Sequence, residues 1–199
     1  NYTVTVNDAN NCSATTAVAI TQPSAISIGI SLTNVSCNGG TNGGITTTIS
    51  GGNGGYTYLW SNGATTQNLV NGQAGVYTLS VTDAQNCLAS LTMNITQPAS
   101  LSLSSVNTNV QCSGGAGGSV NLSVSGGASS YNYIWSNGSV TQDLNNLSSG
   151  NYIVTVTDAN SCSATLSATV TSPTQMNLTT TVTNVTCNGA SSGAVQLTV

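Results

Sequence analysis

Positively charged side chains are missing from this sequence. Its 199 residues include no Lys, Arg or His, and the only acidic residues are Asp8, Asp83, Asp143 and Asp158. Nucleic-acid binding through phosphates needs Lys or Arg, and so does a polybasic patch that binds an acidic membrane surface. We therefore expect no nucleic-acid partner.

Long apolar runs and the residues of acid–base catalysis are also missing. No apolar stretch approaches the roughly 18 residues that span a bilayer, so no membrane insertion is expected. General acid–base catalysis draws mainly on His, Glu and Lys, and a Ser or Thr nucleophile needs a neighbouring base. None of these three residue types occurs here, so the protein is not expected to be an enzyme.

The sequence does contain a gapless repeat of 75 residues. Tyr2, Tyr77 and Tyr152 each begin a short apolar segment that leads to an aspartate and then a cysteine. A fixed period of this kind marks a tandem array. It predicts residues 1–23 as the C-terminal part of a truncated repeat, 24–98 and 99–173 as whole repeats, and 174–199 as the N-terminal part of another.

Within each repeat the apolar residues alternate with polar ones, which is the pattern of half-buried strands. Leu79 and Val81 share one face of such a strand, and Asn62-Gly63 is a tight-turn signal. Helical periodicity is absent. Six or seven short strands per repeat predict an all-β protein made of tandem immunoglobulin-like antiparallel β-sandwiches.

Two aromatic positions support this fold class. Trp60 and Trp135 lie on the third predicted strand, where immunoglobulin-like sandwiches bury a tryptophan. Tyr77 and Tyr152 are placed to form a tyrosine corner, in which the hydroxyl donates a hydrogen bond to the backbone just upstream. The first repeat has Gly72 where the second has Leu147, so we expect Leu69 or Val70 to fill that space.

A set of short motifs resembles the SprB-type repeat of Bacteroidetes gliding-motility and cell-surface adhesins. The motifs of the first repeat are Cys37-Asn-Gly-Gly, Gly51-Gly52, Tyr56-x-Tyr-x-Trp60-Ser-Asn-Gly63, Gly75-x-Tyr77 and Asp83-Ala-x-x-Cys87 running to Thr96-Gln97-Pro98. The resemblance implies a very large extracellular or cell-surface protein that is exported by the type IX system and built from many repeats.

The six cysteines predict disulfides in an oxidising compartment. One pairing joins Cys37 to Cys87 and Cys112 to Cys162 within each repeat, closing loops of about 50 residues for ~4 kcal/mol each; Cys12 and Cys187 would then pair elsewhere. A second pairing joins Cys12 to Cys37, Cys87 to Cys112 and Cys162 to Cys187. A third joins Cys37 to Cys162.

Asp83 and Asp158 precede a cysteine in a predicted turn. Each could contribute to a weak calcium site, but an Asx-turn, in which the carboxylate accepts backbone N–H bonds, also explains the pattern. No other cofactor is expected. The aromatic row of Tyr56, Tyr58 and Trp60 is expected to lie mostly in the core; if exposed, it could stack on sugars.

These observations favour a structural stalk or fibre segment of a repetitive cell-surface adhesin. Its expected partners are neighbouring repeats and, in a fibre, other copies of the chain. Two alternatives stay open. The repeats could themselves bind polysaccharide or surfaces, or they could assemble laterally into a filament or sheath, because no Lys guards their edge strands.

Overall fold

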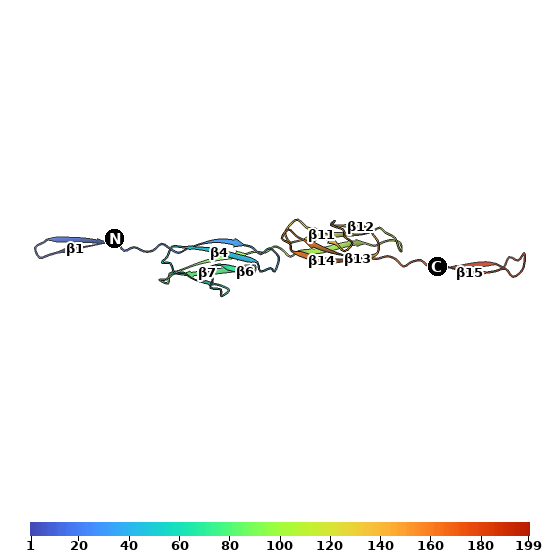
Figure 1. Ribbon diagram of the computed structural model, residues 1–199, viewed down its shortest axis with the longest axis horizontal. Helices are drawn as coiled ribbons and strands as arrows, with labels where there is room; N and C mark the ends of the chain where they lie inside the picture. The colour runs from blue at the N-terminus through green and yellow to red at the C-terminus, as the bar shows by residue number, and fades with distance from the viewer. The chain divides into compact units, whose positions relative to one another are not determined.

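The chain forms two compact units, Asn1–Gln97 and Pro98–Val199. A computed structural model describes all residues 1–199 (Figure 1). Each unit contains one six-stranded sandwich and one separate two-stranded hairpin, and no helix is present. The all-β class predicted from the alternating sequence pattern is therefore confirmed.

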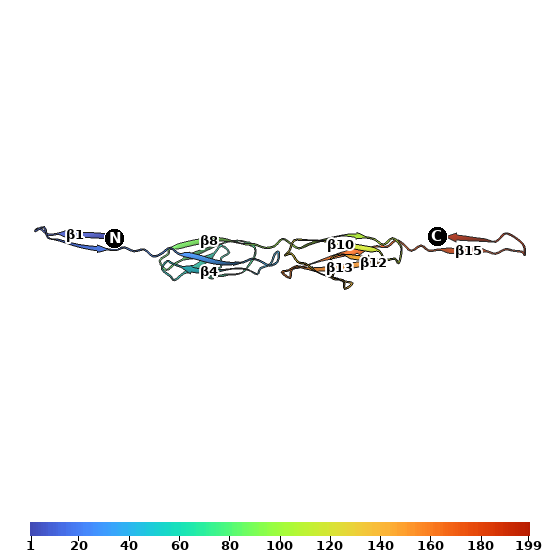
Figure 2. The ribbon, with the colours of Figure 1, turned by 90° about the horizontal axis from the view of Figure 1, so that it is seen from above.

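The first sandwich is built from two three-stranded antiparallel sheets (Figures 1 and 2). One sheet has the order β3-β4-β6 and the other the order β5-β7-β8. The strands are β3 (Ser27–Thr33), β4 (Gly43–Ser50), β5 (Thr57–Trp60), β6 (Leu69–Gly72), β7 (Gly75–Thr82) and β8 (Leu88–Ile95).

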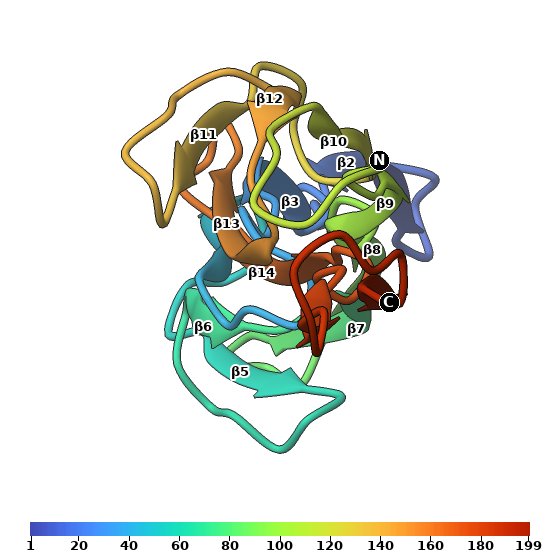
Figure 3. The same cartoon turned by 90° about the vertical axis from the view of Figure 1, so that its right-hand side faces the viewer.

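The second sandwich has the same topology, with sheets β9-β10-β12 and β11-β13-β14. Figure 3 views the strands end-on, with β11, β13 and β14 side by side as their pairing requires. The strands are β9 (Ser102–Thr108), β10 (Gly118–Ser125), β11 (Asn132–Trp135), β12 (Leu144–Leu147), β13 (Gly150–Thr157) and β14 (Ser163–Val170). Each begins 75 residues after its counterpart in the first sandwich.

This strand order is that of an immunoglobulin-like sandwich without its fourth strand. The first, second and fifth strands of that fold form one sheet and the third, sixth and seventh form the other. The fold class is thus an immunoglobulin-like sandwich, confirmed in both units. In antibody domains a disulfide links the second and sixth strands; here Thr47 and Leu79 are buried on those two strands instead.

The core of each sandwich lies between its two sheets, where the inward side chains of alternate positions meet. In the first sandwich the fully buried side chains include Ile45, Trp60, Leu79 and Ile95. The second core contains Val120, Leu122, Trp135, Leu144, Leu147, Val154, Val156, Ala168 and Val170.

One core contact corrects the sequence prediction for Gly72. Val70 is 70% exposed and cannot fill the space beside the glycine. A Cβ atom at Gly72 would lie 2.9 Å from Cδ1 of Ile95 and 3.6 Å from Cδ2 of Leu69. The space is therefore filled by Ile95 from the last strand together with Leu69, so the prediction is right for Leu69 and wrong for Val70. The part played by Ile95 is not revealed by sequence spacing along one strand.

The two hairpins are β1 (Tyr2–Asn7) with β2 (Ser13–Val18), and β15 (Thr179–Thr183) with β16 (Ala194–Thr198). Every residue in these four strands is exposed. A lone two-stranded hairpin is at best marginally stable. These segments therefore have the strand pattern of a sandwich but no core of their own.

No helix in the structure has the length and apolar character that crossing a bilayer requires. The four-part division at residues 23, 98 and 173 stays a prediction.

Candidate functional site

Asp83 links the β7–β8 turn to the loop between β4 and β5. Its Oδ1 accepts hydrogen bonds from the backbone N–H groups of Gln85 and Cys87, both at 2.9 Å. Its Oδ2 accepts bonds from the backbone and side-chain nitrogens of Asn53, also at 2.9 Å. With 4% exposure, the carboxylate is buried between two loops that are 30 residues apart.

The backbone of both loops is shaped for this contact. Gly52 has φ +59°, and a Cβ there would lie 2.9 Å from Oδ2 of Asp83. Asn86 closes the turn at φ 60°, a left-handed conformation that asparagine tolerates better than most residues. The carboxylate thus fits against a glycine where a side chain would collide.

The hydrogen bonds determine the charge state of Asp83. Burial acts to raise its pKa, but the bonds from Cys87, Asn53 and Gln85 outweigh burial and lower the pKa to about 2, from 3.8. Partial loss of solvation and, to a lesser extent, the same carboxylate raise the pKa of the Cys87 thiol. Asp83 is therefore ionised at neutral pH.

Asp158 repeats this arrangement in the second sandwich. Its Oδ2 accepts a bond from the N–H of Ala128 at 2.8 Å, and its Oδ1 accepts bonds from Asn160 and Cys162. The bond from Ala128 is the largest influence on its pKa, which is lowered despite burial. In the first hairpin the carboxylate of Asp8 accepts bonds only within its own turn, from the N–H groups of Asn10 and Cys12.

Asp83 and Asp158 therefore each form an Asx-turn, and each also holds a second loop through hydrogen bonds to its carboxylate. The groups directed at the carboxylates of Asp83 and Asp158 are N–H donors, which do not coordinate a cation. No three His, Cys, Asp or Glu side chains lie close enough together to hold one metal ion. Calcium binding stays a prediction.

The cysteines differ from the two main predicted pairings. Cys37 and Cys162 are disulfide-bonded, whereas Cys12, Cys87, Cys112 and Cys187 are exposed free thiols. The pairing of Cys37 with Cys87 and of Cys112 with Cys162 is therefore absent, and so is the hairpin pairing through Cys12, Cys87 and Cys187. The pairing of Cys37 with Cys162 stays a prediction.

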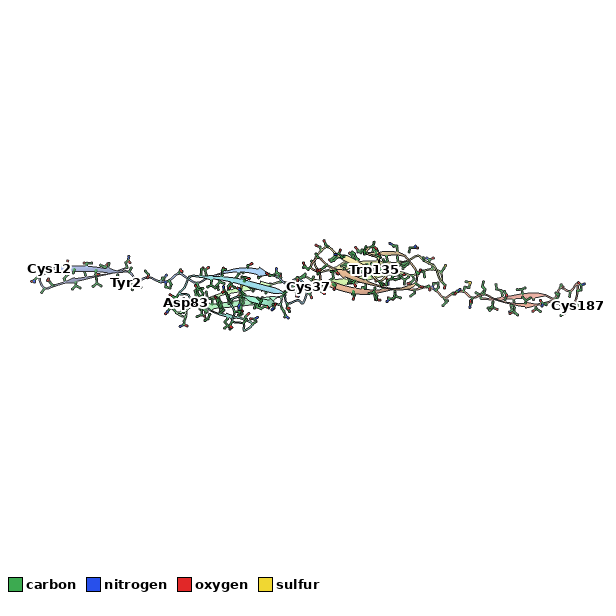
Figure 4. All side chains as sticks on the ribbon, viewed as in Figure 1. Tyr2, Cys12, Cys37, Asp83, Trp135 and Cys187 are labelled. Carbon is green, nitrogen blue, oxygen red and sulfur yellow. The ribbon has the colours of Figure 1, made fainter.

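The physical reason is the length of the last strand. Cys87 immediately precedes β8. Cys37 belongs to a loop at the other end of β8, because the N–H of Gly39 donates to Oε1 of Gln97 at 2.7 Å. Eight strand residues span about 26 Å, whereas disulfide-bonded Cα atoms lie within about 7 Å. Figure 4 shows Cys37 and Asp83 at opposite ends of the first sandwich.

The aromatic strand faces the core. Trp60 is 1% exposed, and its indole N–H donates to the carbonyl of Thr66 at 2.8 Å. Trp135, labelled in Figure 4, makes the same bond to Thr141 at 2.9 Å. Tyr56 and Tyr58 are half-buried and pack against the first core. The rings therefore present little free face on which a sugar could stack.

A tyrosine corner is present in each sandwich. The hydroxyl of Tyr77 donates to the carbonyl of Gln73 at 3.1 Å, and that of Tyr152 donates to Ser148 at 3.0 Å. A second tyrosine bond was not anticipated from the sequence. The hydroxyl of Tyr131 donates to the carbonyl of Gly126 at 2.6 Å, and Tyr56 makes the equivalent bond to Gly51.

The role of Asn53 was also missed. Its side chain is one of the donors to Asp83, but the equivalent residue in the second repeat is Ala128, which donates only through its backbone. The residue type at this position therefore differs between the two repeats, and comparing the repeats does not reveal the contact. Only the backbone N–H, which sequence patterns do not show, is common to both clamps.

The SprB repeat family matches the chain at residues 29–65 and 104–140. Each match runs from the first strand of a sandwich through the aromatic strand and the Asn-Gly turn. Two segments of the chain, one in each sandwich, therefore match the SprB repeat. SprB repeats belong to cell-surface proteins, and they are structural domains of an adhesin-like repeat region.

Solved structures with similarity to these SprB repeats include surface and adhesion proteins. The N-terminal eight Ig domains of Down Syndrome Cell Adhesion Molecule align with TM-score 0.41 and 10% identity, over 75% of this chain and 25% of that one. A C-terminal fragment of intimin, in complex with the intimin-binding domain of its translocated receptor, gives TM-score 0.38 and 15% identity, over 81% and 67%. Domains of the surface layer protein SbsC give 0.31 and 13%, over 87% and 36%.

The chain spans about a quarter of the first of these structures, and TM-scores this low add nothing to what the sheet order itself shows. No curated protein matches the chain.

Proposed function

We propose that this chain is a segment of an extracellular stalk or fibre in a large, repetitive cell-surface adhesin. The observation that carries the proposal is that the buried polar groups of each sandwich are all used in hydrogen bonds within the structure. No buried side-chain nitrogen or oxygen lacks a hydrogen-bond partner. The two buried aspartates, the buried tryptophans and the corner tyrosines all make bonds that hold loops to the sandwich.

Function in such a segment follows from spacing and mechanical integrity. Repeats of one architecture add length in equal steps, and they need no reactive group to do so. Within this proposal the adhesin is exported by a type IX system and contributes to adhesion or gliding motility. Enzymatic activity is not expected of the repeats.

The proposal is tested on intact cells that produce the protein. Antibodies raised against residues 24–173 should label the outside of unpermeabilised cells, and immunogold electron microscopy should place the label along filaments. Label that appears only after permeabilisation would contradict an extracellular stalk.

One alternative, lateral assembly into a filament or sheath, is favoured by a specific observation at the sheet edge. The edge strands β5 and β11 carry no charge, and Leu59 and Ile134 on them are exposed. Exposed apolar edges without Lys are open to pairing with another chain. Sedimentation velocity across a hundredfold range of concentration would then show growing oligomers, whereas the stalk proposal predicts a constant sedimentation coefficient.

The other alternative is that the repeats bind surface polysaccharide. A polar hollow of about 540 Å³ in the second sandwich is lined by Asn137, Gln142 and Asp143, among others. The half-buried Tyr133 donates a hydrogen bond to Gln142 at 3.3 Å. This hollow is where a sugar would be sought first.

A further inference from the structure

The two cysteines of each SprB repeat lie at opposite ends of its sandwich. The first-type cysteines, Cys37 and Cys112, lie where the last strand ends: the N–H of Val110 donates to the carbonyl of Thr171 at 3.1 Å, just beyond β14. The second-type cysteines, Cys87 and Cys162, lie where the chain enters the sandwich. There the N–H of Gly52, beside Asp83, donates to the carbonyl of Ser24 at 2.8 Å.

Each free cysteine of a complete sandwich borders a hollow. Cys87 lines one of about 330 Å³ together with Pro23, Ala25 and Ile26, the segment by which the chain enters the first sandwich. Cys112 lines one of about 410 Å³ together with Pro173 and Met176, the segment by which the chain leaves the second. Both thiols are exposed, so another side chain can reach them.

The same two positions are bonded in the other repeat. Cys37 is the counterpart of Cys112, and Cys162 is the counterpart of Cys87. Both counterparts are disulfide-bonded. The bonded set therefore holds one first-type and one second-type cysteine, so neither position is unsuited to forming a disulfide.

We propose that Cys87 and Cys112 are linking positions for neighbouring copies of the repeat. Cys112 forms a disulfide with the second-type cysteine of a following repeat, and Cys87 forms one with the first-type cysteine of a preceding repeat. The occupant of each hollow is thus the cysteine-bearing loop of another repeat in the same polypeptide. The inference rests on the proposed function as a tandem array, and it adds that the array is covalently stapled along its length.

The directional pairing follows from chain connectivity. In a tandem array the exit end of one sandwich is joined to the entry end of the next. First-type cysteines sit at exit ends and second-type cysteines at entry ends, so each junction brings together one of each type. Two cysteines of the same type lie at the same end of successive sandwiches, a whole repeat apart, and would not meet at a junction.

The chemistry needs a disulfide donor of the thiol–disulfide exchange class, such as oxidised glutathione. The Cys112 thiolate attacks one donor sulfur and releases one donor thiolate, forming a mixed disulfide. The thiolate of the second cysteine then attacks the Cys112 sulfur and releases the other donor thiolate. The two cysteine protons end on the two donor thiols, and the donor takes up two electrons.

The experiment lengthens the chain by one repeat, with residues 99–173 duplicated in register directly after Pro173. The added copy carries Ser161→Gly as a mass marker. Both chains are refolded in a glutathione redox buffer, and their free thiols are counted with a chromogenic thiol reagent under denaturing conditions. The 199-residue chain should show four free thiols. The longer chain has eight cysteines, and the proposal expects the count to stay at four because one new disulfide uses two.

A count of six free thiols in the longer chain would overturn the proposal. If the count is four, mass analysis of non-reduced peptic peptides identifies the linked pair. The expected new link joins the Cys112 peptide to the marked peptide of the added copy. Any other new link, or a disulfide-linked dimer on a non-reducing gel, would also overturn it.

Two controls separate this result from other causes. The variant Cys112→Ser in the original copy should raise the count to five and remove the new link. Failure of the stalk function would appear instead as specific surface binding, which leaves the thiol count unchanged. The two proposals therefore fail on different readouts.

Discussion

Gly72 and Ile95 form a compensated pair in the core of the first sandwich. A Cβ at Gly72 would lie 2.9 Å from Cδ1 of Ile95, so the larger residue occupies the room that the glycine leaves. One repeat later the same positions hold Leu147 and Val170, both buried. The glycine of the first sandwich is replaced by leucine in the second, and the isoleucine by the smaller valine. Both cores therefore stay filled, as close packing requires.

This pair gives the first prediction. Gly72→Leu alone should overpack the first core and destabilise it by about 1–3 kcal/mol. Ile95→Val alone should cost about 0.5–1.5 kcal/mol. The double variant should be destabilised by about 1 kcal/mol less than the two single destabilisations added together, because it reproduces the pair of the second sandwich. Urea unfolding followed by Trp60 fluorescence in a Trp135→Phe background measures the first sandwich.

The matched control is the reverse exchange in the second sandwich, Leu147→Gly with Val170→Ile, followed through Trp135. Additive effects in both sandwiches would show that the two positions do not share one space.

The second prediction concerns acid. The pKa of Asp83 is lowered to about 2 in the folded protein, from 3.8. A lowered pKa means that the unfolded chain binds the proton more readily, so the stabilisation is present above pH 3.8 and is lost as the pH falls toward 2. The urea midpoint of the first sandwich should therefore drop between pH 5 and pH 2.

The variant Asp83→Asn should show a lower midpoint at pH 7 and a flatter dependence in this window. Asp8→Asn is the control, since Asp8 bonds only within its own exposed turn. A pH dependence that is as steep in Asp83→Asn as in the wild type would contradict the assignment.

The tyrosine corners give a third prediction. Tyr77→Phe removes the bond to Gln73, and Tyr152→Phe removes the bond to Ser148. Each should destabilise its own sandwich by about 0.5–1.5 kcal/mol, the net value of a typical hydrogen bond. Tyr2→Phe in the exposed hairpin should have no effect on either sandwich, and thermal unfolding is a sufficient measurement.

A fourth prediction uses Ser161, which adopts φ 66° in the β13–β14 turn. The equivalent residues in the other two turns are Asn11 and Asn86, which tolerate this conformation better. Ser161→Gly should stabilise the second sandwich by up to about 1 kcal/mol. Ser163→Gly, in the adjoining strand, should instead destabilise it, because glycine is unfavourable in a strand.

The sequence was sufficient to predict the sandwich, because features within single strands determine it. The alternation around Leu79 and Val81, the tryptophan of the third strand and the spacing of Tyr152 from Leu147 are all visible over a few residues. The cysteine arrangement was not predictable in the same way. Cys37 and Cys87 are spaced suitably along the chain, but the length of β8 holds them at opposite ends of the sandwich.

Only one half of the hydrogen bonding of Asp83 could be predicted from the sequence. The Asx-turn at Asp83 follows from the residues that come after it, whereas the contact with Asn53 joins loops 30 residues apart through backbone donors. The compensation between Gly72 and Ile95 was not predicted for the same reason, because these two residues are far apart in the sequence and lie on different sheets.

The most direct test of the stalk assignment is whether the 199-residue chain itself binds a surface. The purified chain is applied to an array of bacterial polysaccharides and glycans, with the variant Gln142→Ala, which alters the lining of the hollow, as the matched control. The structural account predicts no saturable binding by either protein. Saturable binding to a defined polysaccharide that Gln142→Ala weakens at least tenfold would contradict it and would show that the repeats are the adhesive element.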